Sequence, residues 1–283
     1  MSILSSTQGT PERVYAIIQA SRQAPALAVD ELFTLFNPGV AIDGEIRERP
    51  KAIIDNVQDV SKIMGLGEDA SPMSFISWSD EVHDRLLTLA DDDLDAVVLR
   101  SYAWIVAESY KRRNVSWFLT EKASDLSDLV KSGLGQTANG DPSMNTTKLP
   151  ALRKWLVFLG LLAQVPLLKV RELPTPAKRI HRELKRSDLS QGKTLSAEEF
   201  VSWIAAKMPY LDGGRLFTAA TERMPHLWTA KSLSPVLSIA LQDLHDRDVI
   251  RLQVVGDTGS ATRLNGDSTH KFTSFHAVEI RTV

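Results

Sequence analysis

The chain has 283 residues, of which 43% are hydrophobic and 24% charged, and its formal net charge is −2. This composition is typical of a soluble globular protein with buried cores, and it excludes a strongly basic chain, so any nucleic-acid surface must be a local patch. The absence of cysteine excludes disulfides, thiolate nucleophiles and cysteine-ligated metals, and it suits the cytoplasm, where we expect the protein to act.

The N-terminal segment, residues 1–80, is expected to form a winged-helix-like domain. Thr10 and Pro11 predict a helix start, and Val14, Ile17 and Ile18 give that helix an apolar face. Two more helices are predicted, in "ALAVDELFTLFNPG" and in "PKAIIDNVQDVSKIMGLG", and "MSFISWS" is predicted to follow as a strand.

The next segment, residues 81–135, is expected to be a helical block. The stretch "DDDLDAVVLRSYAWIVAESYKRR" places Val97, Val98 and Tyr102 on one face and its acidic residues near the helix start, where they suit the helix dipole. A further helix is predicted in "SWFLTEKASDLSDLVKSGLG", and the small polar residues that follow predict a linker.

The most apolar part of the chain is "RKWLVFLGLLAQVPLLKV", from Arg153 to Val170. It is shorter than the roughly 20 apolar residues of a membrane-spanning helix, and charged residues flank it, so no membrane partner is expected. We predict a helix that ends near Leu162 and a strand that starts near Val165, with Trp155, Phe158 and Leu162 buried. With the basic helix "AKRIHRELKR", these elements are assigned to a second winged-helix-like unit, residues 148–190.

The last segment, residues 195–283, is predicted to be a C-terminal winged-helix domain. Ser196 and Glu199 form a capping box pattern, and Ser234 caps a later helix. The strands "VIRLQVV" and "FTSFHAVEI" enclose a long loop, which gives the order helix–helix–helix–strand–loop–strand. The expected fold is therefore mainly α with small β-hairpins, in tandem winged-helix units joined by a helical middle block.

No motif for catalysis is convincing. The sequence has no zinc-type histidine pair and no glycine-rich phosphate loop. Glu279 and Arg281, with Asp267 upstream, resemble the acid and E-x-K set of small nucleases, but arginine replaces the lysine. We therefore expect no enzyme, no cofactor and no metal.

A basic cluster is the main candidate site. It comprises Lys169, Arg171, Lys178, Arg179, Arg182, Lys185 and Arg186, against only two acidic residues in the same stretch. Such a cluster could bind the phosphates of double-stranded DNA, or it could be the solvated face of a helix, and both interpretations stay open. The predicted third helices of the first and last segments carry acidic residues, among them Asp55 and Asp243, which favours protein binding there.

The opening "MSIL", the segment "LFNPG" and the helix end "KIMGLGED" resemble the DpdG proteins. The resemblance is strongest over about residues 1–80. These proteins belong to bacterial gene clusters that insert 7-deazapurine derivatives into DNA and restrict unmodified DNA. The resemblance implies a role in the restriction arm of a phage-defence system and transfers no active-site residue.

The expected function is a cytoplasmic, non-catalytic DNA-binding or assembly subunit of a restriction system that depends on DNA modification. Its expected partners are double-stranded DNA and other proteins of the same defence system, and copies of the chain could associate as a homo-oligomer. The alternatives are a winged-helix transcriptional regulator that binds operator DNA and a scaffold that contacts proteins only.

Overall fold

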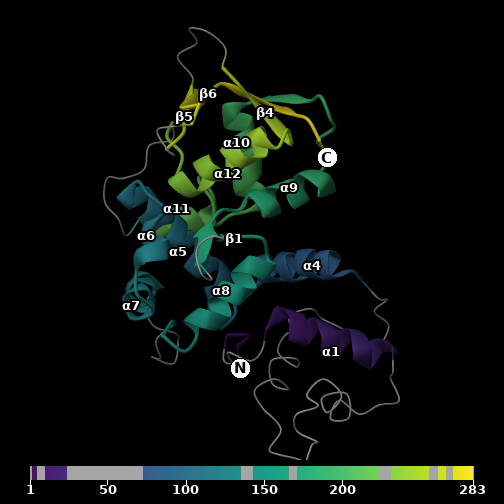
Figure 1. The fold of residues 1–283 in the computed structure, drawn as a ribbon, viewed down its shortest axis with the longest axis vertical. Helices are drawn as coiled ribbons and strands as arrows, with labels where there is room; N and C mark the ends of the chain where they lie inside the picture. Colours follow the sequence, from purple (N-terminus) through teal and green to yellow (C-terminus); the bar gives the residue numbers. More distant parts are fainter. Residues whose placement is uncertain are drawn as a thin grey trace, which may run out of the picture. The chain divides into compact units, whose positions relative to one another are not determined.

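The computed structural model describes residues 2–4, 10–23, 73–134, 143–165, 171–222, 231–254, 261–265 and 270–282. These residues form a mainly helical protein with a few small antiparallel sheets, as the sequence predicted (Figure 1). The predicted helices at 26–39 and 50–67, and the acidic residues of the latter, lie outside the described residues. None of the helices in the described ranges is long and apolar enough to cross a membrane.

The chain divides into two compact units, and its course between them is discontinuous. Unit 1 contains Met1–Ala96 and Asn145–Leu159, and unit 2 contains Val97–Met144 and Gly160–Val283. The four predicted domain ranges remain predictions, and the unit boundaries at Ala96 and Leu159 cut across two of them, 81–135 and 148–190.

Unit 1 is built from three described helices around an aromatic core. The helices are α1 (Pro11–Gln23), α4 (Phe75–Thr88) and α8 (Leu149–Phe158). The start of α1 at Pro11 and the burial of Val14, Ile17 and Ile18 confirm the sequence prediction. In the core, the Trp78 ring lies 4.7 Å from the Phe158 ring and 6.2 Å from the Trp155 ring, centroid to centroid.

The strand predicted at "MSFISWS" is wrong, because these residues begin helix α4. Ser74 caps the helix by accepting a hydrogen bond from the backbone N–H of Ser77 (3.1 Å). From there, Trp78, Val82 and Leu86 repeat at helical spacing and are buried. A short aromatic run satisfies both the strand and the helix pattern, and here packing on α8 decides for the helix.

The apolar stretch from Arg153 onward forms the end of α8 and then a strand. Trp155, Phe158 and Leu162 are 0%, 5% and 1% exposed, which confirms their predicted burial. The helix ends at Phe158 rather than near Leu162, because Gly160 adopts φ +79° and closes the helix with a left-handed residue. The strand β1 accordingly starts at Leu162, earlier than predicted.

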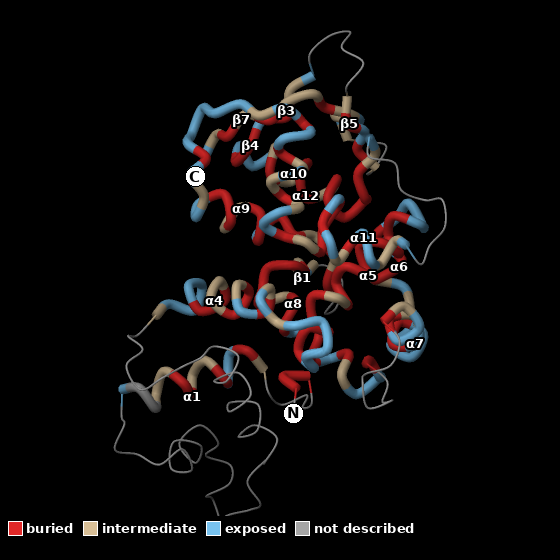
Figure 2. Tube along the Cα trace, turned by 180° about the vertical axis from the view of Figure 1, so that it is seen from behind, coloured by how far each residue is buried: buried red, intermediate tan, exposed pale blue. Residues whose placement is uncertain are grey.

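Unit 2 contains a long buried helix, α5 (Val97–Arg112), around which other helices pack. Its residues are buried along nearly the whole length (Figure 2). α5 packs against α7 (Ala123–Leu134), α11 (Arg215–Thr221) and α12 (Pro235–Asp246), and a short helix α6 (Trp117–Thr120) follows it. The predicted helical character of this block is confirmed.

The rest of unit 2 combines helices with three small sheets. The hairpin of β1 (Leu162–Val165) and β2 (Arg171–Pro174) leads into α9 (Ala177–Arg186), the predicted basic helix. Next come β3 (Thr194–Ser196), α10 (Ala197–Lys207), α11 and α12. The chain ends with β4 (Ile250–Gln253), β5 (Thr262–Arg263), β6 (Ser274–Phe275) and β7 (Ala277–Ile280).

The largest sheet has the order β3–β7–β4, and both pairs are antiparallel. Val278 in the central strand is the register partner of Leu195 on one side and of Leu252 on the other, and it is fully buried. Helices α9, α10 and α12 lie to one side of this sheet (Figures 1 and 2).

The start of α10 and of α12 follows the predicted caps. Ser196 and Glu199 form a complete capping box on α10. Ser234 caps α12. Its backbone N–H and its hydroxyl both donate hydrogen bonds to the carboxylate of buried Asp212. Burial raises the pKa of Asp212 from 3.8 to about 6, although its hydrogen bonds with Ser234 act in the opposite direction.

Candidate nucleic-acid interface

Helix α9 carries most of the predicted basic cluster, and its apolar residues decide which side faces the core. Ala177, Ile180 and Leu184 are buried, in the i, i+3, i+7 spacing of one helix face. This face is directed into unit 2, where α9 packs against α12. The residues on the other side of the helix are therefore turned toward solvent.

The exposed side of α9 is cationic. Lys178 and Lys185 are exposed, and Arg182 and His181 are half-buried. The positions 178, 181, 182 and 185 follow the i, i+3, i+4, i+7 spacing, so the four side chains form one stripe, which we call the α9 stripe. Lys and Arg at this spacing place positive charges along one line, where they can contact phosphate groups of a nucleic-acid backbone.

Arg179 is not part of this surface. It is fully buried, and its Nη1 lies 3.2 Å from Oε1 of Glu183, whose side chain is 8% exposed. Arg186 is 40% exposed and shares the same carboxylate oxygen at 3.4 Å. Glu183 therefore pairs with one buried and one exposed arginine, and the buried Arg179 is not exposed to a phosphate.

Two residues of the predicted cluster precede α9. Lys169 lies outside the described residues. Arg171 begins strand β2, where its backbone is the register partner of Val165, and its side chain is not described. The described part of the cluster is thus confined to α9.

The pKa of His181 reflects the positive charges around the α9 stripe. Burial is the main cause that lowers its pKa, and the positive charges of Lys185 and Arg247 lower it further. Arg247 is the C-cap residue of α12 and forms an ion pair with Asp243 at 3.1 Å. Packing of α12 on α9 therefore adds a cation to the stripe that no local sequence pattern predicted.

Helix α12 presents little surface to a partner. Most of its residues are buried, including Gln242, whose amide nitrogen donates to the carbonyl oxygen of Phe272 (3.2 Å). Asp246 is exposed, and Asp243 is half-buried and pairs with Arg247. A helix with so narrow and acidic an open side is unsuited to enter a DNA groove.

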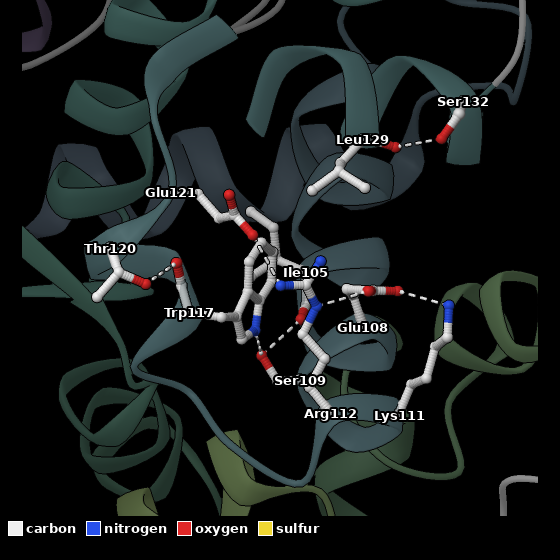
Figure 3. A network of polar contacts seen from close by, with 10 residues as sticks. All are labelled: Ile105, Glu108, Ser109, Lys111, Arg112, Trp117, Thr120, Glu121, Leu129 and Ser132. Carbon is white, nitrogen blue, oxygen red and sulfur yellow. Dashed lines mark hydrogen bonds and ion pairs between the residues drawn. The ribbon is translucent and has the colours of Figure 1, made fainter. Parts of the chain in front are cut away.

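A second group of basic residues, Lys111 and Arg112 in the last turn of α5, is engaged within unit 2. Figure 3 shows Arg112 between the carboxylates of Glu108 and Glu121, at 2.7 and 2.8 Å. The Arg112 guanidinium carbon also lies 4.7 Å from the centroid of the Trp117 ring. Lys111 contacts Glu108 at 3.7 Å. These contacts fix the α5–α6 corner and leave this cluster a weaker candidate than the α9 stripe.

The residues considered for nuclease chemistry are partly described. Glu279 and Arg281 form an ion pair with each other at 2.9 Å, and Arg281 also contacts Asp248 at 3.4 Å. Asp267 lies outside the described residues. The Glu279 carboxylate is thus paired with Arg281, which directly follows the same strand, β7.

Comparison with known proteins gives a family. A family model described as DpdG-like matches residues 1–258, well over half of the chain. The match includes the α9 stripe and α12, whereas β5, β6 and β7 follow it. No curated protein and no solved structure matches the chain.

Proposed function

The chain belongs to the DpdG-like family, which links it to the Dpd 7-deazaguanine DNA-modification system, and we propose that it serves there as a non-catalytic subunit that contacts double-stranded DNA. The family suspected from the opening segments is confirmed by the match. The α9 stripe is the single observation that carries the proposed DNA contact.

We further propose that the C-terminal winged-helix domain, predicted at residues 195–283, also includes α9, which the sequence analysis assigned to the second unit, 148–190. The element order α9, β3, α10, α11, α12, β4 and β7 supports this, and so does the sheet order β3–β7–β4, in which the strand between the first two helices joins the returning strand. In this interpretation α12 takes the place of the recognition helix, and the segment between β4 and β7 is the wing.

The contact that this domain makes with DNA is proposed to involve the backbone rather than the bases. Most of α12 is covered, and its open side bears Asp243 and Asp246. Lys178 and Lys185, in contrast, are exposed on a helix whose other side is fixed in the core. Phosphate contacts position a protein on DNA without reading its sequence, which suits a subunit of a larger assembly better than an operator-binding regulator.

The acidic side of α12 favours a second role, in assembly with proteins of the same system. A negatively charged surface repels phosphates but attracts a basic surface of a partner protein. In a scaffold without DNA contact, this would be the only role, and duplex binding would be absent even at low salt.

The test measures binding of the full chain to a duplex of about 20 base pairs, with fluorescence anisotropy as the readout, at several salt concentrations. Lys178→Gln and Lys185→Gln together should weaken binding and reduce the slope of log K against log salt by about two, one for each lost phosphate contact. The matched control is Lys193→Gln with Lys207→Gln, since both lysines are exposed and lie in unit 2 outside α9.

The outcomes separate the candidates. An effect confined to the α9 pair supports the proposal. No binding of the unaltered chain at low salt would leave the protein-only scaffold, and an equal effect of both pairs would show that the stripe has no special role. A strong preference in a selection from random duplexes would favour the operator-binding regulator.

A further inference from the structure

The hairpin of β5 and β6 encloses an open hollow of about 500 Å³ in unit 2. It is lined by Ala261, Arg263, Leu264, Thr273 and Ser274. Arg263 and Ser274 are register partners across the two strands, so their side chains project on the same face of the hairpin. The neighbouring partners, Thr262 and Phe275, are buried on the opposite face and anchor the hairpin.

The polar groups of this hollow are available to a ligand. Arg263 is exposed, and within the described ranges its guanidinium makes no ion pair or hydrogen bond. The hydroxyls of Thr273 and Ser274 likewise make no hydrogen bond to any described residue. None of the described residues that line the hollow carries a carboxylate. A guanidinium and hydroxyls that line the same hollow are groups that can donate hydrogen bonds to the oxygens of a phosphate.

The backbone that carries Arg263 is held firmly in place. Its N–H donates to the carbonyl oxygen of Lys231 (2.8 Å), and its carbonyl oxygen accepts from the N–H of Leu233 (3.0 Å). The side-chain amide of Asn265 donates to the Ser232 hydroxyl (2.7 Å) and to the Leu233 carbonyl oxygen (2.8 Å). The hairpin is thus fixed to the segment that leads into α12, and a ligand would not have to order it.

We propose that this hollow binds a phosphate group through Arg263, Thr273 and Ser274. The site is separate from the α9 stripe. The source of the phosphate, a DNA strand, rests on the proposed function, since the hairpin lies between β4 and β7, in the segment assigned to the wing. A free phosphate compound has the same chemistry and is distinguished by the test.

The test uses the full chain with Arg263→Gln, and Arg251→Gln as the control. Arg251 is also an exposed arginine, on β4, and does not line the hollow. Both side chains are exposed, so both variants should keep the unaltered far-UV circular dichroism spectrum. Duplex affinity is measured at low salt, and inorganic phosphate is titrated while the Nε–Hε signal of Arg263 is followed by NMR, with sodium chloride of equal ionic strength as the reference titration.

We expect Arg263→Gln to weaken duplex binding about tenfold, the effect of one charge-assisted contact, and Arg251→Gln to leave it unchanged. If duplex binding is unchanged but phosphate shifts the Arg263 signal more than chloride does, the site stands and its ligand is a free phosphate compound. If neither occurs, or if both variants weaken duplex binding equally, the proposal is overturned. Should the unaltered chain bind no duplex, the proposed function fails, while the phosphate titration still decides the hollow.

Discussion

Replacing Arg179 with methionine should destabilise the protein rather than remove a phosphate contact. The substitution leaves the Glu183 carboxylate, 8% exposed, without its buried partner. Removing one member of a buried ion pair costs about 3–5 kcal/mol, because an uncompensated charge stays inside. Arg186 lies 3.4 Å from the same carboxylate oxygen and compensates in part, so we expect the lower end, about 3 kcal/mol.

Urea unfolding followed by circular dichroism measures this loss. With a slope of about 2 kcal/mol per molar urea, the midpoint should fall by roughly 1–2 M. The matched control is Lys178→Met, on the exposed side of the same helix, which should change the free energy of unfolding by less than about 0.5 kcal/mol. Replacing Arg179 and Glu183 together by methionine should restore much of the stability, since no lone charge remains.

Duplex binding under native conditions supplies the decisive comparison. If Arg179→Met has the same urea midpoint as the unaltered chain but loses duplex affinity as the α9 stripe variants do, the assignment of Arg179 to the interior is refuted. The opposite pattern, in which the midpoint falls and the folded fraction still binds, supports it.

Three further results are expected. Asp212→Asn should flatten the pH dependence of stability. Because the pKa of Asp212 rises from 3.8 to about 6 on folding, this group contributes at most about 3 kcal/mol, a contribution that is complete below pH 3.8 and is lost as the pH rises through 6. Urea midpoints measured at pH 4 and at pH 7 should therefore differ less in the variant than in the unaltered chain. Ser196→Ala should cost about 1 kcal/mol of unfolding free energy, since it removes the acceptor of the Glu199 N–H, and a urea midpoint equal to that of the unaltered chain would contradict this role. His181→Gln should reduce the tightening of duplex binding between pH 7.5 and 6, because a nearby phosphate favours the charged ring, and an unaltered pH profile would place the DNA elsewhere.

Local signals in the sequence predicted much of unit 2. The capping box at Ser196 and the Ser234 cap are short patterns whose hydrogen bonds lie within one helical turn, so no distant contact is needed to realise them. The basic helix α9 was likewise predicted, because its apolar residues repeat at helical spacing.

Features that depend on distant packing could not be predicted in this way. The aromatic run at 73–79 suits a strand or a helix, and the choice depends on Trp155 and Phe158, far along the chain. The burial of Arg179 is invisible to a count of charges, although Glu183 four residues later and the neighbouring Ile180 and Leu184 would have indicated an internal pair. Lys185 and Arg247 share an electrostatic neighbourhood only because α12 packs on α9.

The discontinuous course of the chain has a consequence for how it is made. The aromatic core of unit 1 needs α8, which is synthesised only after the whole segment from Val97 to Met144 has been translated. At about 5–20 residues per second, the partners of Trp78, Trp155 and Phe158, are synthesised roughly 3–12 s after residue 96 has been added. When unit 1 is complete at residue 159, α5 has already been synthesised, but its partners α11 and α12 have not. Cutting the gene at a single point between residues 97 and 160 would therefore separate α5 from its partners or α8 from the rest of unit 1.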